Sequence, residues 1–208
     1  MNGATTGAGG SLGGRTRRRV EVRLDEILNV TLAEIERVGL ASVRVSDVAQ
    51  ALGVSTGLVF YHFNTRDELV AQAFSHAVEL DLVRMRKAAA KAHDAAARVR
   101  AVLRTSGPTG SAAGWRLWVD GWALAQREPH VAAELRRLAG EYRAELQAAI
   151  EAGVAAGDLR CPDPASSAAR LGALLDGMSV AVTVQRSMTR KQLRQWMEEA
   201  VDRELGLG

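Results

Sequence analysis

Residues 45–69, VSDVAQALGVSTGLVFYHFNTRDEL, decide the fold that we predict for this chain of 208 residues. The stretch contains two short segments with helical apolar spacing, about 46–52 and 56–63, joined by a turn between Gly53 and Ser55. Gly53 can adopt the positive φ that ends a helix, and the Ser55 hydroxyl can cap the next one. Two short helices joined in this way are typical of a helix-turn-helix, whose second helix enters the major groove of DNA.

The second of these helices carries side chains suited to DNA. Thr56, Tyr61 and His62 can donate hydrogen bonds to phosphates or to base edges. Arg66 follows just beyond the helix, where a cation can meet a phosphate. The alternative is a set of core helices without a partner, but the polar residues of exposed type argue against it. The residues that we expect in the core are Val48, Leu52, Val54, Val59 and Phe63.

The sequence before the helix-turn-helix divides into a tail and a helix. We expect residues 1–22 to form a disordered tail, because the first part is mostly Gly, Ala, Thr and Ser with little apolar bulk. The tail leads into a basic arm, which either reaches DNA phosphates or a minor groove or only keeps the chain soluble. Its arginines are Arg15, Arg17, Arg18, Arg19 and Arg23. We expect a helix from Leu24, where apolar residues begin to recur at steps of three and four, to the stop signal Gly39.

Helical patterns continue from this unit toward the C-terminus. Thr65 and Glu68 form a capping-box pattern, which predicts that a long helix begins near Arg66. Further helical segments follow, and no convincing strand pattern of period two occurs. We therefore predict an all-α fold. A three-helix domain with the helix-turn-helix would cover residues 23–66, and a larger helical bundle would cover residues 67–208.

Composition and motifs exclude several classes of protein. The net charge is only +3, so a nucleic-acid site must come from local clustering of basic residues. A single cysteine, Cys161, excludes an intramolecular disulfide and a cysteine-based zinc cluster. The sequence has no nucleophile elbow, phosphate-binding loop, metal-ligand set or paired-carboxylate motif, so we predict no enzyme, no metal and no cofactor. No apolar run approaches the roughly 20 residues of a membrane span, and we expect a cytoplasmic protein.

The helix-turn-helix segment resembles the Tet repressor family of bacterial transcription regulators. The resemblance is continuous over about residues 24–70, and beyond residue 70 only the number and lengths of the helices agree. The residues that carry it are Gly39 and the runs 45–49 (VSDVA), 53–63 (GVSTGLVFYHF) and 65–69 (TRDEL). Many positions agree in type and spacing at once, which makes this motif specific.

The resemblance implies DNA contacts at particular residues. They lie at the start of the second helix (Arg44, Ser46), at the leading end of the recognition helix (Thr56, Gly57, Leu58), and at its far end and just beyond (Tyr61, His62, Arg66). One departure is Phe60, where the family usually has a tyrosine, so that we expect apolar contacts there in place of a phosphate hydrogen bond. Because Gly57 and Leu58 have no polar side chain, shape and apolar contact are expected to contribute more than base-specific hydrogen bonds.

Three tryptophans between residues 115 and 122 lie on one face of a single predicted helix. Such a stripe either packs in the core or lines a small-molecule cavity between the helices of a bundle. The residues that would line the cavity are Met85, Trp115, Trp118, Trp122, Tyr142 and Met178. An acidic group such as Asp120 or Asp176 would suit a cationic ligand. Asp120, however, does not project with the tryptophans, and Arg116 could neutralise it, so the sequence alone does not favour a cation.

The segment from Pro164 to about Val184 is rich in small and apolar residues on more than one face, and Asp163 can cap it. The resemblance implies that this helix and the last helix pair with a twofold mate in a four-helix bundle. The interface candidates are Leu171, Leu174, Leu175, Met178, Val182 and Trp196. A symmetric dimer would place its two recognition helices about 34–36 Å apart on a near-palindromic operator. The alternative is an ordinary buried helix in a monomer.

These features predict a ligand-responsive regulator of the Tet repressor type: a repressor that binds double-stranded operator DNA as a homodimer and is released by a small-molecule effector. The effector would shift the long helix that begins near Arg66 and joins the two domains, and so change the spacing of the DNA-reading heads. One alternative is a constitutive repressor or nucleoid-type binder without an effector. Another is a helical interaction module that binds no nucleic acid.

Overall fold

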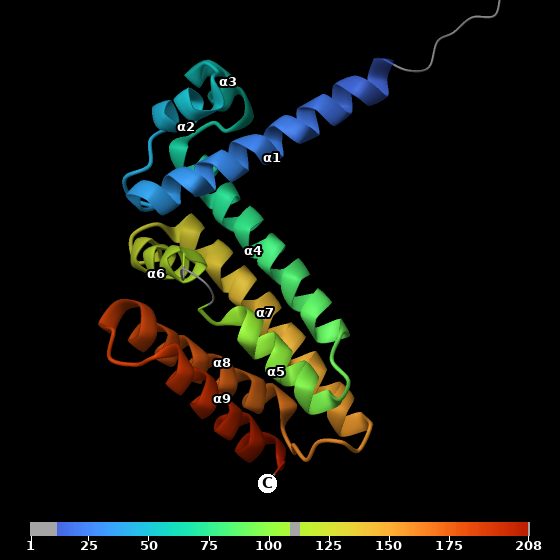
Figure 1. Ribbon diagram of the computed structural model, residues 1–208. Helices are drawn as coiled ribbons and strands as arrows, with labels where there is room; N and C mark the ends of the chain where they lie inside the picture. Colours follow the sequence, from blue (N-terminus) through green and yellow to red (C-terminus); the bar gives the residue numbers. More distant parts are fainter. Residues whose placement is uncertain (1–11, 109–112, 208) are drawn as a thin grey trace, which may run out of the picture.

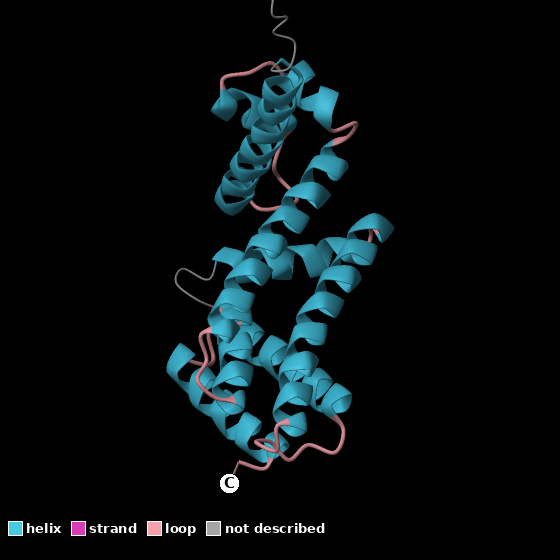
Figure 2. Cartoon of the chain, turned by 90° about the vertical axis from the view of Figure 1, so that its right-hand side faces the viewer, coloured by secondary structure: helices cyan, strands magenta, loops and turns pink. Residues whose placement is uncertain are grey.

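The computed structural model describes residues 12–108 and 113–207, and every regular element in these two ranges is a helix (Figure 2). The predicted all-α fold is confirmed. The elements are α1 (Leu12–Val38), α2 (Val45–Leu52), α3 (Thr56–His62), α4 (Arg66–Ala90), α5 (Ala95–Ser106), α6 (Ala113–Ala125), α7 (Pro129–Ala155), α8 (Pro164–Val180), a π-helical segment η1 (Ala181–Gln185) that continues α8, and α9 (Arg190–Leu205).

Helices α1, α2 and α3 form the N-terminal domain at one end of the molecule (Figure 1). Helix α2 packs on α1 and on α3, and the apolar residues of the three helices share one core. Val48 and Val59 are 0% exposed and Phe63 is 1% exposed, while Ile27 and Ile35 of α1 are each 3% exposed. The spacing of three and four residues in the sequence therefore corresponds to a real core, and the polar residues between these positions are left to face outward.

Helix α1 begins earlier than the apolar pattern indicates. It starts at Leu12, not near Leu24, and so includes residues that the sequence assigns to the tail. Arginine is a good helix former, and adding residues to an existing helix is favourable once its first turn is formed. The backbone of the basic arm thus belongs to α1. Residues 1–11 and the arginine side chains of the arm lie outside the described part of the structure.

Helix α4 joins the N-terminal domain to the bundle and runs along its length (Figure 1). The Thr65 hydroxyl caps it by accepting a hydrogen bond from the Glu68 N–H at 3.1 Å. The Glu68 carboxylate accepts from the Asn64 N–H at 2.9 Å, one residue before the position that a capping box uses. The predicted start of α4 is therefore correct, although the reciprocal half of the cap is shifted by one residue.

The remaining helices form the larger bundle. Helix α5 packs between α4 and α7, α7 also packs on α6 and α8, and α8 packs on α9 as an outer layer (Figures 1 and 2). Within the continuous helix Pro164–Gln185, a window of 18 residues has a mean hydropathy of 1.2, so the helix is long and apolar enough to cross a membrane, although the sequence pattern did not single it out as a span. One third of that helical window (33%) is buried inside the protomer, and helices that pack in soluble proteins have the same composition.

Candidate DNA-binding surface and ligand cavity

The turn between α2 and α3 has the geometry that its residues predict. Gly53 adopts the left-handed conformation with φ 68°, and the Val54 N–H donates to the Ala49 carbonyl at 3.0 Å. The Ser55 hydroxyl then accepts from the Leu58 N–H at 3.3 Å and caps α3. A helix stop and a helix start are thus only two residues apart, which fixes the angle between the two helices.

Helix α3 turns its polar side outward. Val59 and Phe63 face the core, whereas Tyr61 is 82% exposed. His62 is half-buried, and its ring packs edge-on against Tyr61 with the ring centroids 5.2 Å apart. The hydroxyl of Tyr61 is therefore available to a partner, and the half-buried His62 holds the Tyr61 ring.

The leading end of α3 is also accessible. Thr56 and Gly57 are exposed, and Leu58 is half-buried with its N–H engaged by the Ser55 cap. Phe60 is 47% exposed. This end of the helix offers one hydroxyl and several apolar groups, which matches a surface that reads shape and thymine methyls more than hydrogen-bonding patterns.

An open hollow of about 640 Å³ lies where the loop after α1 meets α2 and α3. It brings together residues from separate segments, and those with exposed side chains are Ala41, Ser42, Arg44, Ser46, Thr56 and Phe60. All of these except Ala41 and Ser42 were candidates from the sequence. The only signal for Ser42 in the sequence is a polar residue in the short loop that precedes the second helix.

Arg66 has surroundings that differ from the expected phosphate contact. Its Nη2 donates to the Leu40 carbonyl at 2.5 Å and its Nε donates to the Val43 carbonyl at 3.1 Å. Its Nη1 forms an ion pair with Asp67 at 2.8 Å. All three guanidinium nitrogens thus have contacts within the protein, and the side chain ties the start of α4 to the loop between α1 and α2.

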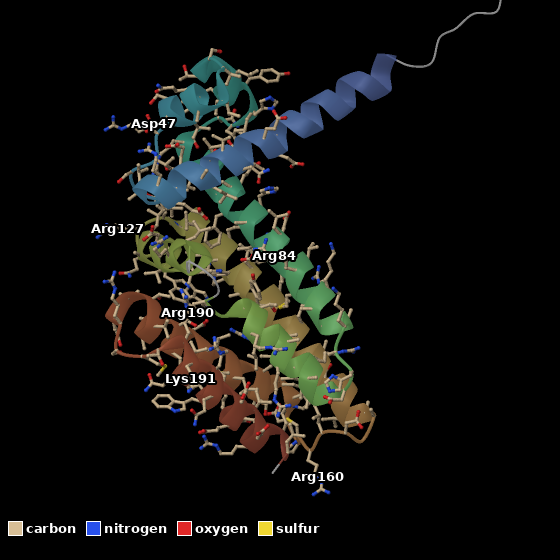
Figure 3. The ribbon with its side chains drawn as sticks, in the orientation of Figure 1. Asp47, Arg84, Arg127, Arg160, Arg190 and Lys191 are labelled. Carbon is tan, nitrogen blue, oxygen red and sulfur yellow. The ribbon has the colours of Figure 1, made fainter. Side chains whose placement is uncertain are left out.

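Asp47 places a negative charge on the outer side of the N-terminal domain (Figure 3). It lies in the first turn of α2, where the helix dipole stabilises a carboxylate. The Ser46 hydroxyl donates to this carboxylate at 3.3 Å. To contact DNA, the Ser46 hydroxyl therefore has to turn away from Asp47, and the carboxylate itself repels nearby phosphates.

A cavity of about 190 Å³ lies between α5, α6, α7 and α8. Trp115, Trp118 and Trp122 of α6 line it together with Tyr142 of α7. The rings contact one another, with centroid distances of 5.7 Å for Trp115–Trp122, 6.2 Å for Trp118–Trp122 and 5.9 Å for Trp118–Tyr142. The stripe is therefore both packed and cavity-lining, and four of the six predicted lining residues meet here.

The two methionines that were expected in this cavity lie elsewhere. Met85 is 1% exposed and sits behind the cavity wall, where the Ser106 hydroxyl lies 3.5 Å from its sulfur. Met178 lines a hollow on the outer face of α8 and α9. It is two residues beyond Asp176, and two residues turn an α-helix by roughly 200°, so the two side chains point to nearly opposite faces.

Asp176 brings an acidic group to the cavity wall. Although the residue remains exposed on one side, burial of its carboxyl raises its pKa above the ordinary 3.8, and Arg143 of the same wall acts in the opposite direction. Burial also raises the pKa of Tyr142 to about 12, so its phenol is neutral at physiological pH. In the sequence, Asp176 stands out by its isolation, because it is the only charged residue in the apolar run 171–185.

The other acidic candidate, Asp120, faces the N-terminal domain. Its Oδ2 accepts from the Leu40 N–H at 3.4 Å, at the loop that follows α1. On the cavity side of the same helix, the Trp118 ring packs edge-on against Phe74 of α4, with the ring centroids 5.2 Å apart. Helix α6 therefore contacts the cavity, the long helix α4 and the end of α1.

The outer face of α8 and α9 carries apolar groups at the surface. Leu174 is 37% exposed and Trp196 is 42% exposed, and both line a shallow hollow of about 560 Å³. Leu171 and Leu175 are only 1% and 4% exposed, so these two interface candidates lie mainly in the core of the protomer. The candidates that keep accessible surface are Leu174, Met178, Val182 and Trp196.

Known sequences match both parts of the chain. Residues 27–73 match the family described as bacterial regulatory proteins, tetR family, and residues 95–206 match the BetI-type transcriptional repressor, C-terminal. The HTH-type transcriptional regulator BetI of Burkholderia thailandensis is 29% identical over 167 residues, which is 76% of this chain and 80% of that protein. BetI of Paraburkholderia phytofirmans is 32% identical over 128 residues, 57% of this chain, and the chain spans only 60% of that relative.

Solved structures share the whole architecture. A transcriptional regulator from Saccharomonospora viridis, in complex with choline, has a TM-score of 0.79 at 24% identity, covering 89% of this chain and 98% of that one. A TetR-family regulator from Rhodococcus sp. has a TM-score of 0.77 at 25% identity, covering 88% of this chain and 98% of that one. With its N-terminal helix-turn-helix and its BetI-type C-terminal domain, the chain belongs to the TetR family of bacterial transcriptional regulators.

Proposed function

We propose that this regulator is a cytoplasmic repressor that binds a near-palindromic operator as a homodimer. The observation that supports DNA contact is the outward side of α3, where Thr56 is exposed and Tyr61 is 82% exposed. Arg44 and Ser46 share a hollow with Thr56, so a duplex seated on α3 meets both the base-reading end and a phosphate-binding cation. His62 supports the ring of Tyr61 and lies within reach of the same backbone.

The effector that fits the cavity best is a small quaternary ammonium compound of the choline type. Cations bind over the faces of aromatic rings, and tryptophan is the strongest such partner. Three tryptophans and Tyr142 form the wall, and the Asp176 carboxylate supplies the opposite charge. The volume of about 190 Å³ lies below the range of drug-sized pockets, which favours a small effector. The choline complex of the Saccharomonospora viridis regulator, which has the same fold, is consistent with this class.

Arg143 also lines the cavity, and its charge opposes a cationic ligand. No ion pair joins Arg143 to Asp176 among the side chains that the structure describes, so the carboxylate stays available. Arg143 and Asp176 are both partly open to solvent, which screens both charges. Of the two, only the Asp176 carboxylate attracts a cationic ligand.

Release of DNA would follow from a shift of α6. A ligand against Trp118 presses on Phe74 of α4, and the same helix holds the end of α1 through Asp120. Both contacts lead to the domain that carries α3. An effector releases DNA only as far as it binds one of the two arrangements better than the other.

Calorimetric titration of the full chain with choline chloride tests the effector. We expect one site per protomer and a loss of roughly tenfold or more in affinity for Asp176→Asn, because the negative charge at the cavity wall is removed. Glu79→Gln, an exposed acid on α4, is the matched control and should bind as the parent does. Failure of choline to bind, or equal binding by Asp176→Asn, contradicts the cation site. Choline that binds without moving an operator band shift favours the constitutive alternative.

A further inference from the structure

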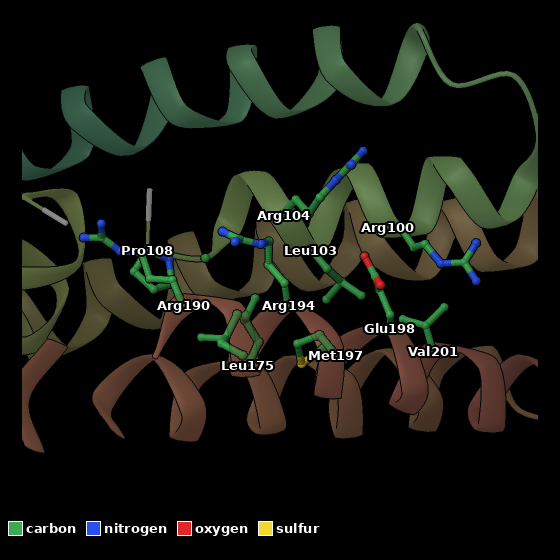
Figure 4. A pocket seen from close by; sticks show the side chains of 12 residues that line it. Arg100, Leu103, Arg104, Pro108, Leu175, Arg190, Arg194, Met197, Glu198 and Val201 are labelled. Carbon is green, nitrogen blue, oxygen red and sulfur yellow. The ribbon is translucent and has the colours of Figure 1, made fainter. Parts of the chain in front are cut away.

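A second cavity, of about 360 Å³, lies between α5 and α9 with part of α8 at its base (Figure 4). Its base is apolar: Leu103, Leu175, Leu193, Met197 and Val201 line it, and none is more than 7% exposed. The volume lies within the range of small-molecule sites. An apolar base of this kind suits an alkyl or similarly apolar body.

Positive charge collects at one end of this cavity. Arg190 and Arg194, one turn apart on α9, lie at the end beside Pro108 (Figure 4). Neither has an ion-pair partner among the side chains that the structure describes. At the opposite end, Arg100 pairs with Asp202. Arg104 of α5 and Glu198 of α9 line the cavity between the two ends (Figure 4). The cavity thus has two unpaired arginines at one end and an apolar base.

We propose that this cavity binds an amphiphilic organic anion, with its carboxylate between Arg190 and Arg194 and its alkyl chain along Leu103, Leu175 and Met197. Arginine pairs favourably with carboxylates, and the pairing is stronger where apolar groups exclude water. From Arg190 to Val201 the rise along α9 is roughly 16 Å, which gives room for an extended medium-length chain. The chemical class is a fatty-acid carboxylate.

This site is separate from the aromatic cavity, with which it shares the wall residues Leu103 and Leu175, and from the outer face of α8 and α9. The aromatic cavity has a carboxylate and tryptophans and suits a cation, whereas the second cavity has arginines and suits an anion. On α9, Arg194 and Met197 line the anion cavity, while Trp196 and Arg203 line the outer hollow. Residues at these positions lie on different sides of a helix with 3.6 residues per turn. A partner subunit seated on Trp196 would leave the anion cavity open.

Calorimetric titration of the full chain with decanoate, below its micelle concentration, tests the proposal. We expect one site per protomer, weaker binding of the uncharged decanol, and a loss of roughly tenfold or more for the Arg190→Gln/Arg194→Gln variant. Arg98→Gln, an exposed arginine on α5 that does not line the cavity, is the matched control and should bind as the parent does. Thermal unfolding of each variant checks that it is folded.

Five results would overturn the proposal. Decanoate does not bind, or decanol binds equally well, or the double arginine variant binds unchanged. In the fourth, binding is lost in Trp118→Ala and kept in the arginine variant, which places the anion in the aromatic cavity. A change of oligomeric mass in the arginine variant would also contradict it, because it would assign this surface to a second copy of the chain.

Discussion

Arg66 illustrates how far the role of a single side chain depends on its neighbours. The resemblance implies a phosphate contact, but its guanidinium donates to the carbonyls of Leu40 and Val43. Both carbonyls are partly buried, and an unsatisfied buried acceptor costs about 1–3 kcal/mol. A planar fork that reaches two carbonyls at once is a geometry that a lysine ammonium cannot reproduce.

We therefore expect Arg66→Ala to lower the free energy of unfolding by about 1–3 kcal/mol, with no change in the slope of log K against log salt for operator binding. Arg44→Ala is the comparison, because Arg44 is exposed on the candidate DNA surface. It should leave stability unchanged and reduce the salt slope by about 0.9 for each phosphate contact that is lost. Chemical denaturation and a salt series of band shifts give both quantities. A reduced slope for Arg66→Ala would restore its phosphate role.

Asp176 gives the effector site a pH dependence. Burial raises the pKa of its carboxyl above 3.8, so the charge that a cation needs is lost as the pH falls from neutral through this raised value. Choline affinity should therefore decrease with acidification, and Asp176→Asn should bind choline weakly at every pH.

The raised pKa of Asp176 also means that the folded state binds the proton more tightly than the unfolded state, so ionised Asp176 destabilises the fold slightly at neutral pH. A titration series shows the first effect, and a higher Tm of Asp176→Asn at neutral pH shows the second.

At the scale of helices, the sequence predicts a capped helix end more reliably than the direction in which each face of the helix points. Ser55, Thr65 and Asp163 each cap a helix where the sequence indicates, because a cap depends only on a few adjacent residues. The side of α8 that meets the cavity depends on how several helices pack. That packing turns Asp176 inward and Met178 outward, and no local pattern determines it. Most of the candidate DNA-contact residues lie on the exposed side of the helix-turn-helix, whereas of the predicted cavity residues only the aromatic ones line the cavity.

Helix α6 offers a separate prediction, since it touches both the effector cavity and the loop after α1. Asp120→Ala removes the contact with the Leu40 N–H without changing the tryptophan face. We expect choline to bind with unchanged affinity, while its effect on operator binding falls by roughly fivefold or more. Arg116→Ala, an exposed change on the same helix, should preserve the response. If Asp120→Ala responds to choline like the parent, the signal passes through Phe74 and α4 alone.

At the scale of the whole molecule, the proposed function requires two chains. One α3 helix reads only one half-site of the operator. When two N-terminal domains are held together in a dimer, binding of the second domain to DNA is intramolecular, so the dimer binds the operator far more tightly than one chain does. The outer face of α8 and α9 is the surface with the apolar groups for such pairing, through Leu174 and Trp196. The ion pair between Arg170 and Glu204 lies at the edge of the same hollow, as expected for the polar rim of an interface.

We expect Leu174→Glu/Trp196→Arg to be monomeric at micromolar concentration, because these charges would have to be buried without partners. The mass in sedimentation should then be the 22.3 kDa of one chain. Operator affinity should fall by roughly 10²–10⁴, the usual gain from linking two sites, while choline binding in the intact cavity persists. The control is Val83→Glu, which changes an exposed apolar residue on α4 and not on α8 or α9, and this variant should remain dimeric. A doubly substituted chain that still sediments as a dimer would move the interface away from α8 and α9, and with it the spacing of the two α3 helices on DNA.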